Sequence, residues 1–166
     1  MIVERRADLF VLTSKQAWVK DQVAEAVSLY AALGVRSDRV RRAQAASIGS
    51  AKAIVELSDV EELQALRPAS RDLSDWSFAH GINGAYVYAR DAAGQIYARA
   101  FNPLSGVIED AATGVAAGAL AQALDHPYDR WLTVFQIPSH APRCELHARR
   151  LASGETEVGG RAHRAM

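Results

Sequence analysis

The chain has 166 residues, of which 49% are hydrophobic, and its 19 Lys and Arg residues balance its 19 Asp and Glu residues. This composition excludes a disordered chain, and the zero net charge gives no electrostatic reason to expect nucleic acid or an anionic membrane as partner. A single Cys excludes an internal disulfide and fits a reducing compartment. The chain opens with no cationic-then-apolar leader, and its longest apolar run is too short to span a bilayer. We therefore expect one cytosolic domain over residues 1–166.

The first quarter of the chain predicts a strand, a helix and a charged loop. Residues 9–12 read as a strand. In residues 21–33 the apolar side chains recur at helical spacing and Gly34 follows as a terminator, which predicts an amphipathic helix packed on one face. The charged run 36–42 is interrupted by Asp38 and contains no aromatic, so we interpret it as a solvated loop and strand edge.

The next segment predicts two extended stretches and two short helices. Residues 43–57 read as two strands. Residues 58–62 form a capping box, in which Ser or Asp is followed three residues later by Glu. The short helix that follows is ended by Pro68, and a further helical turn is expected over residues 73–78.

Strand patterns dominate the remainder outside one central segment. Residues 85–101 read as two strands joined by a tight turn at 91–94. Residues 131–137 predict another strand, and residues 143–151 and 156–164 a hairpin. Several strands, one central helix and two peripheral helices make an α+β domain.

That central segment runs from Ala100 to Leu124, and we expect the rest of the chain to be organised around it. From Ala112 to Leu124 it is almost entirely Ala, Leu, Val and Gly. A helix that is apolar on every side is expected to lie inside the protein, with other elements wrapped around it. Gly114 and Gly118 lie four residues apart, so they share one helix face and would let a neighbouring backbone come close.

Two carboxylates, Glu109 and Asp110, come just before this helix. They lie at the end that carries free N–H groups and the positive pole of the helix dipole. Such an end, opening among Gly, Thr and acidic residues, suits an anionic ligand. Spacing alone favours the plainer interpretation that Asp110 or Thr113 caps a core helix, and both interpretations stay open.

No residue pattern indicates a metal site or a catalytic nucleophile. The five His residues form no pair at the spacing of a helical zinc site, and Cys144 has no Cys partner. Ser105 lacks the flanking glycines of a nucleophile elbow. Gly81 and Gly84 precede a strand instead of linking a strand to a helix, so no dinucleotide fingerprint is present.

The central segment also carries a family resemblance. It reads A-R-A-F-N-P over residues 98–103, then Gly106, then E-D-A-A-T-G-V-A-A-G over residues 109–118. This resembles the signature of the PhzF-like isomerases of phenazine biosynthesis, which typically reads R-x-F-x-P, a Gly, and E-D-P-A-T-G-S-A-A-G. That family belongs to the diaminopimelate-epimerase superfamily, whose members have two similar halves, each a β-barrel-like sheet around a central helix.

The resemblance covers the whole chain but only the second half of such a protein. Trp131, Gln136 and Arg143 fall where the family's closing strands lie. The resemblance implies a single half of the diaminopimelate-epimerase-like fold, with a β-barrel-like sheet wrapped around a central buried helix. Residues 1–14 would then be a strand or an arm from the first half. The family's first half supplies an acid/base Glu and a Gly-His motif, and neither has a counterpart here.

The function that this resemblance implies is isomerisation by proton transfer between carbon atoms, without a cofactor. The family's motif Asp is matched by Asp110, which is the expected catalytic residue. The groups expected to bind the substrate carboxylate are Glu109, Thr113, Gly114 and Val115.

The match departs from the family pattern at two places near the expected site. The motif Pro is Ala111 here and the motif Ser is Val115, which removes a hydroxyl donor. If that donor faced a carboxylate, its loss would weaken binding by about 1.5–3 kcal/mol. The family's usual Q-G and M-G-R-P-S is replaced over residues 136–144, where two glycines are lost.

Three hypotheses follow. The chain is an isomerase completed by a second chain, a non-catalytic domain that binds a small anion or a protein, or a truncated gene product. We expect an incomplete, catalytically impaired domain, with a small carboxylate-bearing molecule as a possible ligand and no nucleic acid or membrane partner. A homodimer or a separate first-half chain is expected as protein partner, because a lone half would leave an apolar surface in water.

Overall fold

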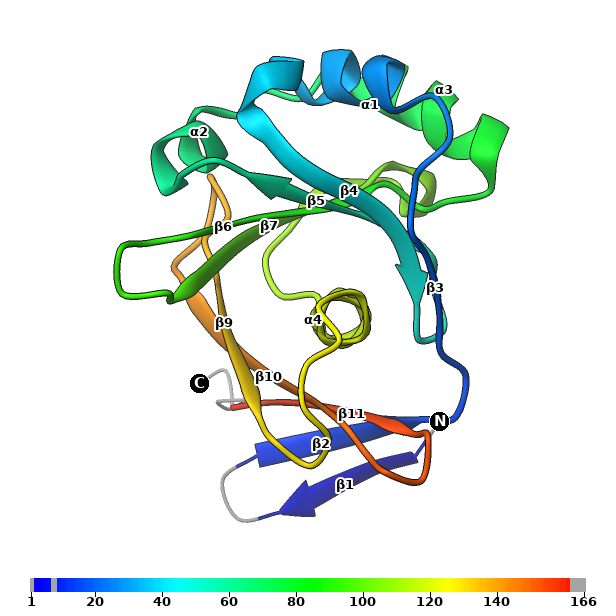
Figure 1. Cartoon of the computed structure of the whole chain (residues 1–166), viewed down its shortest axis with the longest axis vertical. Coiled ribbons are helices and arrows are strands. Elements are labelled where there is room, and N and C mark those ends of the chain that lie inside the picture. The colour runs from blue at the N-terminus through cyan, green and yellow to red at the C-terminus, as the bar shows by residue number, and fades with distance from the viewer. Residues whose placement is uncertain (1, 7–8, 162–166) are drawn as a thin grey trace.

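The computed structural model describes residues 2–6 and 9–161, and these form one large mixed sheet with helices packed on it (Figure 1). The strands are β1 (Ile2–Arg6), β2 (Leu9–Ser14), β3 (Trp18–Lys20), β4 (Val40–Ser47), β5 (Lys52–Leu57), β6 (Ala85–Arg90), β7 (Ile96–Asn102), β8 (Val107–Asp110), β9 (Leu132–Gln136), β10 (Cys144–Arg150) and β11 (Thr156–Gly160). The helices are α1 (Ala26–Leu33), α2 (Val60–Ala65), α3 (Ser70–His80) and α4 (Gly114–Ala123), with 3-10 turns η1 (Ser37–Arg39) and η2 (Pro103–Ser105). The expected α+β class is confirmed.

The sheet runs in the order β1-β2-β11-β10-β9-β7-β6-β5-β4-β3, and β8 pairs with β7 off this path. The β5–β6 and β7–β9 pairs are parallel, whereas β6–β7 and β7–β8 are antiparallel. The sheet curves around α4 but is not closed into a barrel (Figure 1). This corrects the expectation of a barrel-like sheet. The end strand β3 has only three residues and, among the described residues, pairs with β4 and with no strand from the β1 end.

Helix α4 lies between the part of the sheet that contains β4 and β5 and the part that contains β10 and β11 (Figure 1). Its residues with no exposed surface are Ala116, Ala117, Ala119, Leu120 and Ala121. A Cβ atom built on Gly118 would lie 2.3 Å from Ile48 Cδ1 and 2.7 Å from Val158 Cγ1. The glycine therefore admits two side chains close to the helix axis, and not the neighbouring backbone that the sequence pattern predicted.

The central strands are buried on both faces because alternate side chains face different helices. Ile54 and Tyr86 belong to the hydrophobic cluster that includes α4. Val55 and Val87 belong to a second cluster, formed with α1, α2 and α3 on the other face. The strands with two packed faces read as continuous apolar runs, as expected for parallel neighbours such as β5 and β6.

Several element boundaries differ from those that the sequence predicts. Helix α1 begins at Ala26 instead of Asp21, after Glu25 in the left-handed region at φ 46°. Asp59 caps α2 by accepting the Glu62 N–H at 2.8 Å, which confirms the predicted cap. Strand β11 ends at Gly160, and residues 162–164 of the expected hairpin lie outside the described residues. Within the described part of the chain, no helix is long and apolar enough to cross a membrane.

Candidate carboxylate-binding and proton-transfer site

The expected site lies on β8, a short strand that the sequence pattern did not predict. Strand β7 ends at Asn102, and turn η2 leads to Gly106, whose φ of 73° is a left-handed conformation that glycine adopts without strain. The chain then returns antiparallel to β7, with a register shift between Ala100 and Asn102. Glu109 and Asp110 are thereby brought back beside the side chains of β7. Because successive side chains of a strand point to opposite faces, the two carboxylates face different surroundings.

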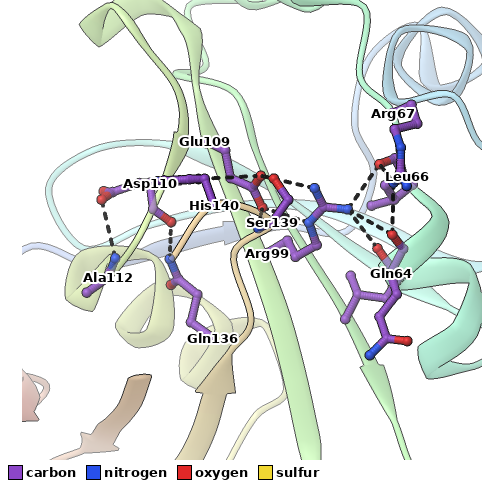
Figure 2. Close-up of polar contacts among 11 residues, drawn as sticks. Gln64, Leu66, Arg67, Arg99, Glu109, Asp110, Ala112, Gln136, Ser139 and His140 are labelled. Atoms are coloured by element: carbon purple, nitrogen blue, oxygen red, sulfur yellow. Dashed lines mark hydrogen bonds and ion pairs between the residues drawn. The ribbon is translucent and has the colours of Figure 1, made fainter. Parts of the chain in front are cut away.

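The Glu109 carboxylate is closed off by charge and hydrogen bonds (Figure 2). Arg99 forms a two-pronged ion pair with it, with Nε–Oε1 at 2.7 Å and Nη2–Oε2 at 3.0 Å. The Ser139 backbone N–H donates to Oε1 at 3.2 Å, and the Ser139 hydroxyl donates to Oε2. Burial alone would raise the pKa of Glu109, but the hydrogen bonds from Arg99 and Ser139 outweigh it and hold this pKa below its usual value.

The same Arg99 side chain also fixes the end of helix α2. Its Nη1 donates to the backbone carbonyls of Leu63 at 3.1 Å and Leu66 at 3.0 Å (Figure 2). The last carbonyls of a helix lack partners within the helix, so a buried guanidinium satisfies them. The Arg99 side chain is only 4% exposed and that of Glu109 8%. The pair thus joins β7, β8, α2 and the connection between β9 and β10.

The two carboxylate oxygens of Asp110 differ in their hydrogen bonds. Oδ2 accepts from Asn102 Nδ2 at 3.1 Å and from the Thr113 hydroxyl at 2.8 Å. Oδ1 accepts one long bond, from the Ala112 N–H at 3.3 Å (Figure 2). A carboxylate oxygen can accept more than one hydrogen bond, so Oδ1 keeps capacity for a ligand or a proton.

A buried amide, Gln136, fixes the loop between Asp110 and helix α4. It has no exposed surface. Its Nε2 donates to the Asp110 carbonyl at 2.6 Å, and its Oε1 accepts the Thr113 N–H at 3.1 Å. The loop is therefore held at both ends by one side chain from β9.

At the N-terminus of α4, some backbone N–H groups have no acceptor among the residues that the structure describes. Thr113 occupies the N-cap position, but no side chain caps the helix there, because the Thr113 hydroxyl bonds to Asp110 instead. The predicted simple cap by Asp110 or Thr113 is therefore wrong. Among the hydrogen bonds of the described residues, the N–H groups of Gly114 and Val115 have no acceptor. Both residues are half-buried.

A buried lysine contacts the Asn102 side chain, which in turn contacts Asp110. Lys52, at the start of β5, is 2% exposed. Its Nζ donates to Asn102 Oδ1 and to the Asn83 carbonyl, each at 2.6 Å. Burial lowers the pKa of Lys52 to about 8, although attraction to Asp110 works in the opposite direction.

The structure brings all five predicted residues into one region but gives them different surroundings. Asp110 and Gly114 are half-buried, and Thr113 is buried. The Val115 side chain packs against the cluster around α4, and Glu109 is held in the ion pair. The pattern analysis assigned no role to Lys52, Arg99, Asn102 or Gln136. A lone Lys in the apolar strand sequence K-A-I-V-E-L was the available signal for Lys52.

Two further observations bear on what this region could hold. Within residues 2–6 and 9–161, no group of three or more His, Cys, Asp or Glu side chains could hold a metal ion. A hollow of about 720 Å³ lies elsewhere, and its lining, which includes Ser14, Lys15, Ile48 and Glu155, contains none of the predicted site residues. The Asp110 region is therefore not part of that hollow.

Comparison with known proteins agrees with the motif. Residues 12–144 match the family model described as phenazine biosynthesis-like protein. An uncharacterized isomerase from Deinococcus radiodurans is 36% identical over 80 residues, which cover 48% of this chain and 26% of that protein.

Solved structures show the same fold. A putative phenazine biosynthesis PhzC/PhzF protein from Clostridium difficile superposes with a TM-score of 0.73 at 15% identity, covering 99% of this chain and 58% of that one. A predicted epimerase from Pseudomonas aeruginosa gives a TM-score of 0.69 at 22% identity, covering 96% and 58%. A hydroxyproline epimerase from Agrobacterium vitis gives 0.54 at 14% identity, covering 98% and 53%. The chain thus spans little more than half the length of these solved relatives. It belongs to the phenazine biosynthesis-like (PhzC–PhzF) family and corresponds to one half of the two-part fold.

Proposed function

We propose that this chain is a PhzF-like isomerase-family domain that binds a small carboxylate at the N-terminus of α4, with Asp110 placed to exchange a proton with the bound molecule. The observation that carries the proposal is the juxtaposition of two free N–H groups, on Gly114 and Val115, with a carboxylate whose Oδ1 has one long contact.

Each part of this surface has a chemical use. Free N–H groups at a helix N-terminus favour an anion through both hydrogen bonding and the helix dipole. A carboxylate within reach of the bound molecule can act as general acid or base. Thr113 and Gln136 fix the loop that separates the two, so the anion site and Asp110 keep a constant relation. In this proposal Glu109 acts indirectly, as the anchor of β8.

We propose further that the chain is catalytically impaired when alone. Moving a proton between two carbon positions without a cofactor needs a donor and an acceptor. Of the two neighbouring carboxylates, Glu109 is committed to Arg99 and Ser139, so Asp110 is the one with free capacity. The second group would have to come from another polypeptide, either an identical copy or a chain equivalent to the rest of the longer relatives.

A different class of function has its own support. Leu104, Val107 and Ile108, in and beside η2 and β8, are between 42% and 58% exposed. Apolar side chains gathered beside a polar site are typical of a surface that contacts another protein. Together with the valine at position 115, they favour a non-catalytic domain that binds an anion or a protein partner as the alternative.

The binding proposal is tested by titrating the ¹⁵N-labelled chain with benzoate, a rigid carboxylate, and following the backbone amide resonances. We expect saturable shifts concentrated in residues 112–116. Shifts that do not saturate, or that concentrate around the hollow beside Ser14, would refute a carboxylate site at α4.

The catalytic and assembly proposals need separate measurements. Incubation with dihydro-hydroxyanthranilate in D₂O should give no deuterium incorporation by the chain alone. Incorporation that is abolished by Asp110→Asn would show instead that the chain is a complete catalyst.

Light scattering at micromolar concentration should give about twice the 18.0 kDa chain mass. A monomer mass would exclude the homodimer and leave the separate chain.

A further inference from the structure

The starting observation is a lysine where a hydrophobic residue would be expected. Lys52 is 2% exposed and begins a strand whose other buried residues are all apolar. A buried ammonium is costly unless hydrogen bonds compensate it. Its two partners, the Asn83 carbonyl and Asn102 Oδ1, lie at 2.6 Å, which is short for an N–H···O bond. These short contacts indicate that the Lys52 ammonium has a specific role at this position.

The chemistry of the ammonium dictates the orientation of Asn102. A lysine ammonium can only donate, so Asn102 must present its oxygen to Lys52. The Asn102 amide is planar, so its Nδ2 then points to the other side, where it donates to Asp110 Oδ2 at 3.1 Å. A flipped amide would place its NH2 group against the Lys52 ammonium, where two donors meet, and its oxygen against the Asp110 carboxylate, where two acceptors repel each other. Lys52 therefore decides which end of Asn102 meets Asp110.

We propose that Lys52 is a positioning residue for Asp110: by fixing the Asn102 amide, it holds Oδ2 in place and leaves Oδ1 as the oxygen available to a bound molecule. The role deepens the function proposed above and rests on it, since the orientation of Asp110 matters only if a ligand meets Oδ1. The Thr113 hydroxyl, which donates to the same Oδ2 at 2.8 Å, reinforces this division.

The electrostatics agree with this geometry. Lys52 and Asp110 attract each other, and this attraction opposes the effect of burial on the lysine. The Lys52 ammonium thus offsets part of the negative charge of Asp110, which would otherwise repel the bound anion. A residue of similar length without a donor, such as Met, would supply neither the charge nor the fixed amide.

The first test measures the geometry and does not depend on any ligand. Solvent exchange of the Asn102 side-chain amide protons is measured by NMR in the wild type, Lys52→Met and Lys52→Gln. Lys52→Met removes the donor, so exchange should become about tenfold faster, as for the loss of a hydrogen bond of about 1.4 kcal/mol. Lys52→Gln keeps a donor and should retain most of the slow exchange. Lys15→Met, at a side chain that is 83% exposed, is the matched control and should change nothing.

The second test asks whether Lys52 acts through Asp110. Benzoate dissociation constants are measured for Lys52→Met in the wild-type and Asp110→Asn backgrounds, with Asn102→Ala replacing Lys52→Met if that variant does not fold. We expect about tenfold weakening in the wild-type background, where Asp110 loses the ammonium that offsets its repulsion of the anion, and less than threefold in the Asp110→Asn background.

The outcomes separate this inference from the proposed function. Failure of benzoate to bind the wild type would refute the carboxylate site, while the amide exchange rates would still decide the orientation of Asn102. Unchanged exchange in Lys52→Met, or equal weakening of benzoate binding in both backgrounds, would overturn the positioning role of Lys52.

Discussion

Glu109 and Asp110 are neighbours on one strand, yet their surroundings are opposite. Glu109 has a buried guanidinium and two donors from Ser139, and its side chain is 8% exposed. Asp110 has neutral donors on one oxygen and a single long contact on the other. The comparison teaches that two adjacent carboxylates of one motif can divide structural and chemical roles, because a strand turns them to opposite faces.

The largest expected effect comes from breaking the ion pair between Arg99 and Glu109. Arg99→Met would leave the Glu109 carboxylate buried without its charge partner and would remove the Arg99 donor from the Leu63 carbonyl, whereas the Leu66 carbonyl would keep the donor from Arg67. We expect the free energy of unfolding to fall by about 3–5 kcal/mol, measured by urea denaturation. Arg90→Met is the matched control on the neighbouring strand. Its ion pair with Glu56 is 4.0 Å long and its side chain is 39% exposed, so about 0.5 kcal/mol is expected. Equal losses in the two variants would contradict the structural role of the Arg99 pair.

The arrangement of Asp110 and the N-terminus of α4 depends on helix α4 being fixed in place, and substitutions at Gly118 test this. Gly118→Leu would drive a side chain into Ile48 and Val158 and should lower the free energy of unfolding by about 1–3 kcal/mol or more. Gly114→Ala is the control on the same helix face, because its Cβ would lie 3.5 Å from Val158, an ordinary contact. Thermal melting of both variants measures the difference. If Gly118→Leu melts like the wild type, the packing around α4 is not as described.

A smaller effect should appear in the pH dependence of stability. The pKa of Lys52 is lowered from 10.5 to about 8 by burial, so between these values the unfolded chain binds more protons than the folded one. The stability of the wild type relative to Lys52→Met should therefore rise as the pH increases from about 8 to 10, by about 1–2 kcal/mol. Other titrating groups cancel in this difference. A flat or falling difference would mean that Lys52 is not buried as a charged group.

The helices and strands of this fold could be predicted from the sequence more completely than the site. Apolar periodicity located α1, α2 and most of the strands, and the motif residues placed α4 within two residues of its ends. Strand β8 was missed because two of its four residues are exposed, the other two are half-buried, and its apolar and polar side chains do not alternate. Strand β3 was missed because all three of its residues are exposed.

The site itself could be predicted only where the motif is contiguous. Asp110, Thr113 and Gly114 are close in sequence, so spacing brought them together. Lys52 and Gln136 reach the same place from strands far away in the chain, and only the sheet order shows that they meet. The ion pair of Glu109 escaped prediction for the same reason, since the return of β8 alongside β7 sets it up.

The most direct test of the division between the two carboxylates is the benzoate dissociation constant of Glu109→Gln and Asp110→Asn against the wild type. Asp110→Asn removes a negative charge beside the bound anion, so benzoate should bind about three- to tenfold more tightly. Glu109→Gln should leave the constant within about twofold, because Arg99 and Ser139 already separate Glu109 from the site. A constant that responds to Glu109→Gln and not to Asp110→Asn would contradict the account.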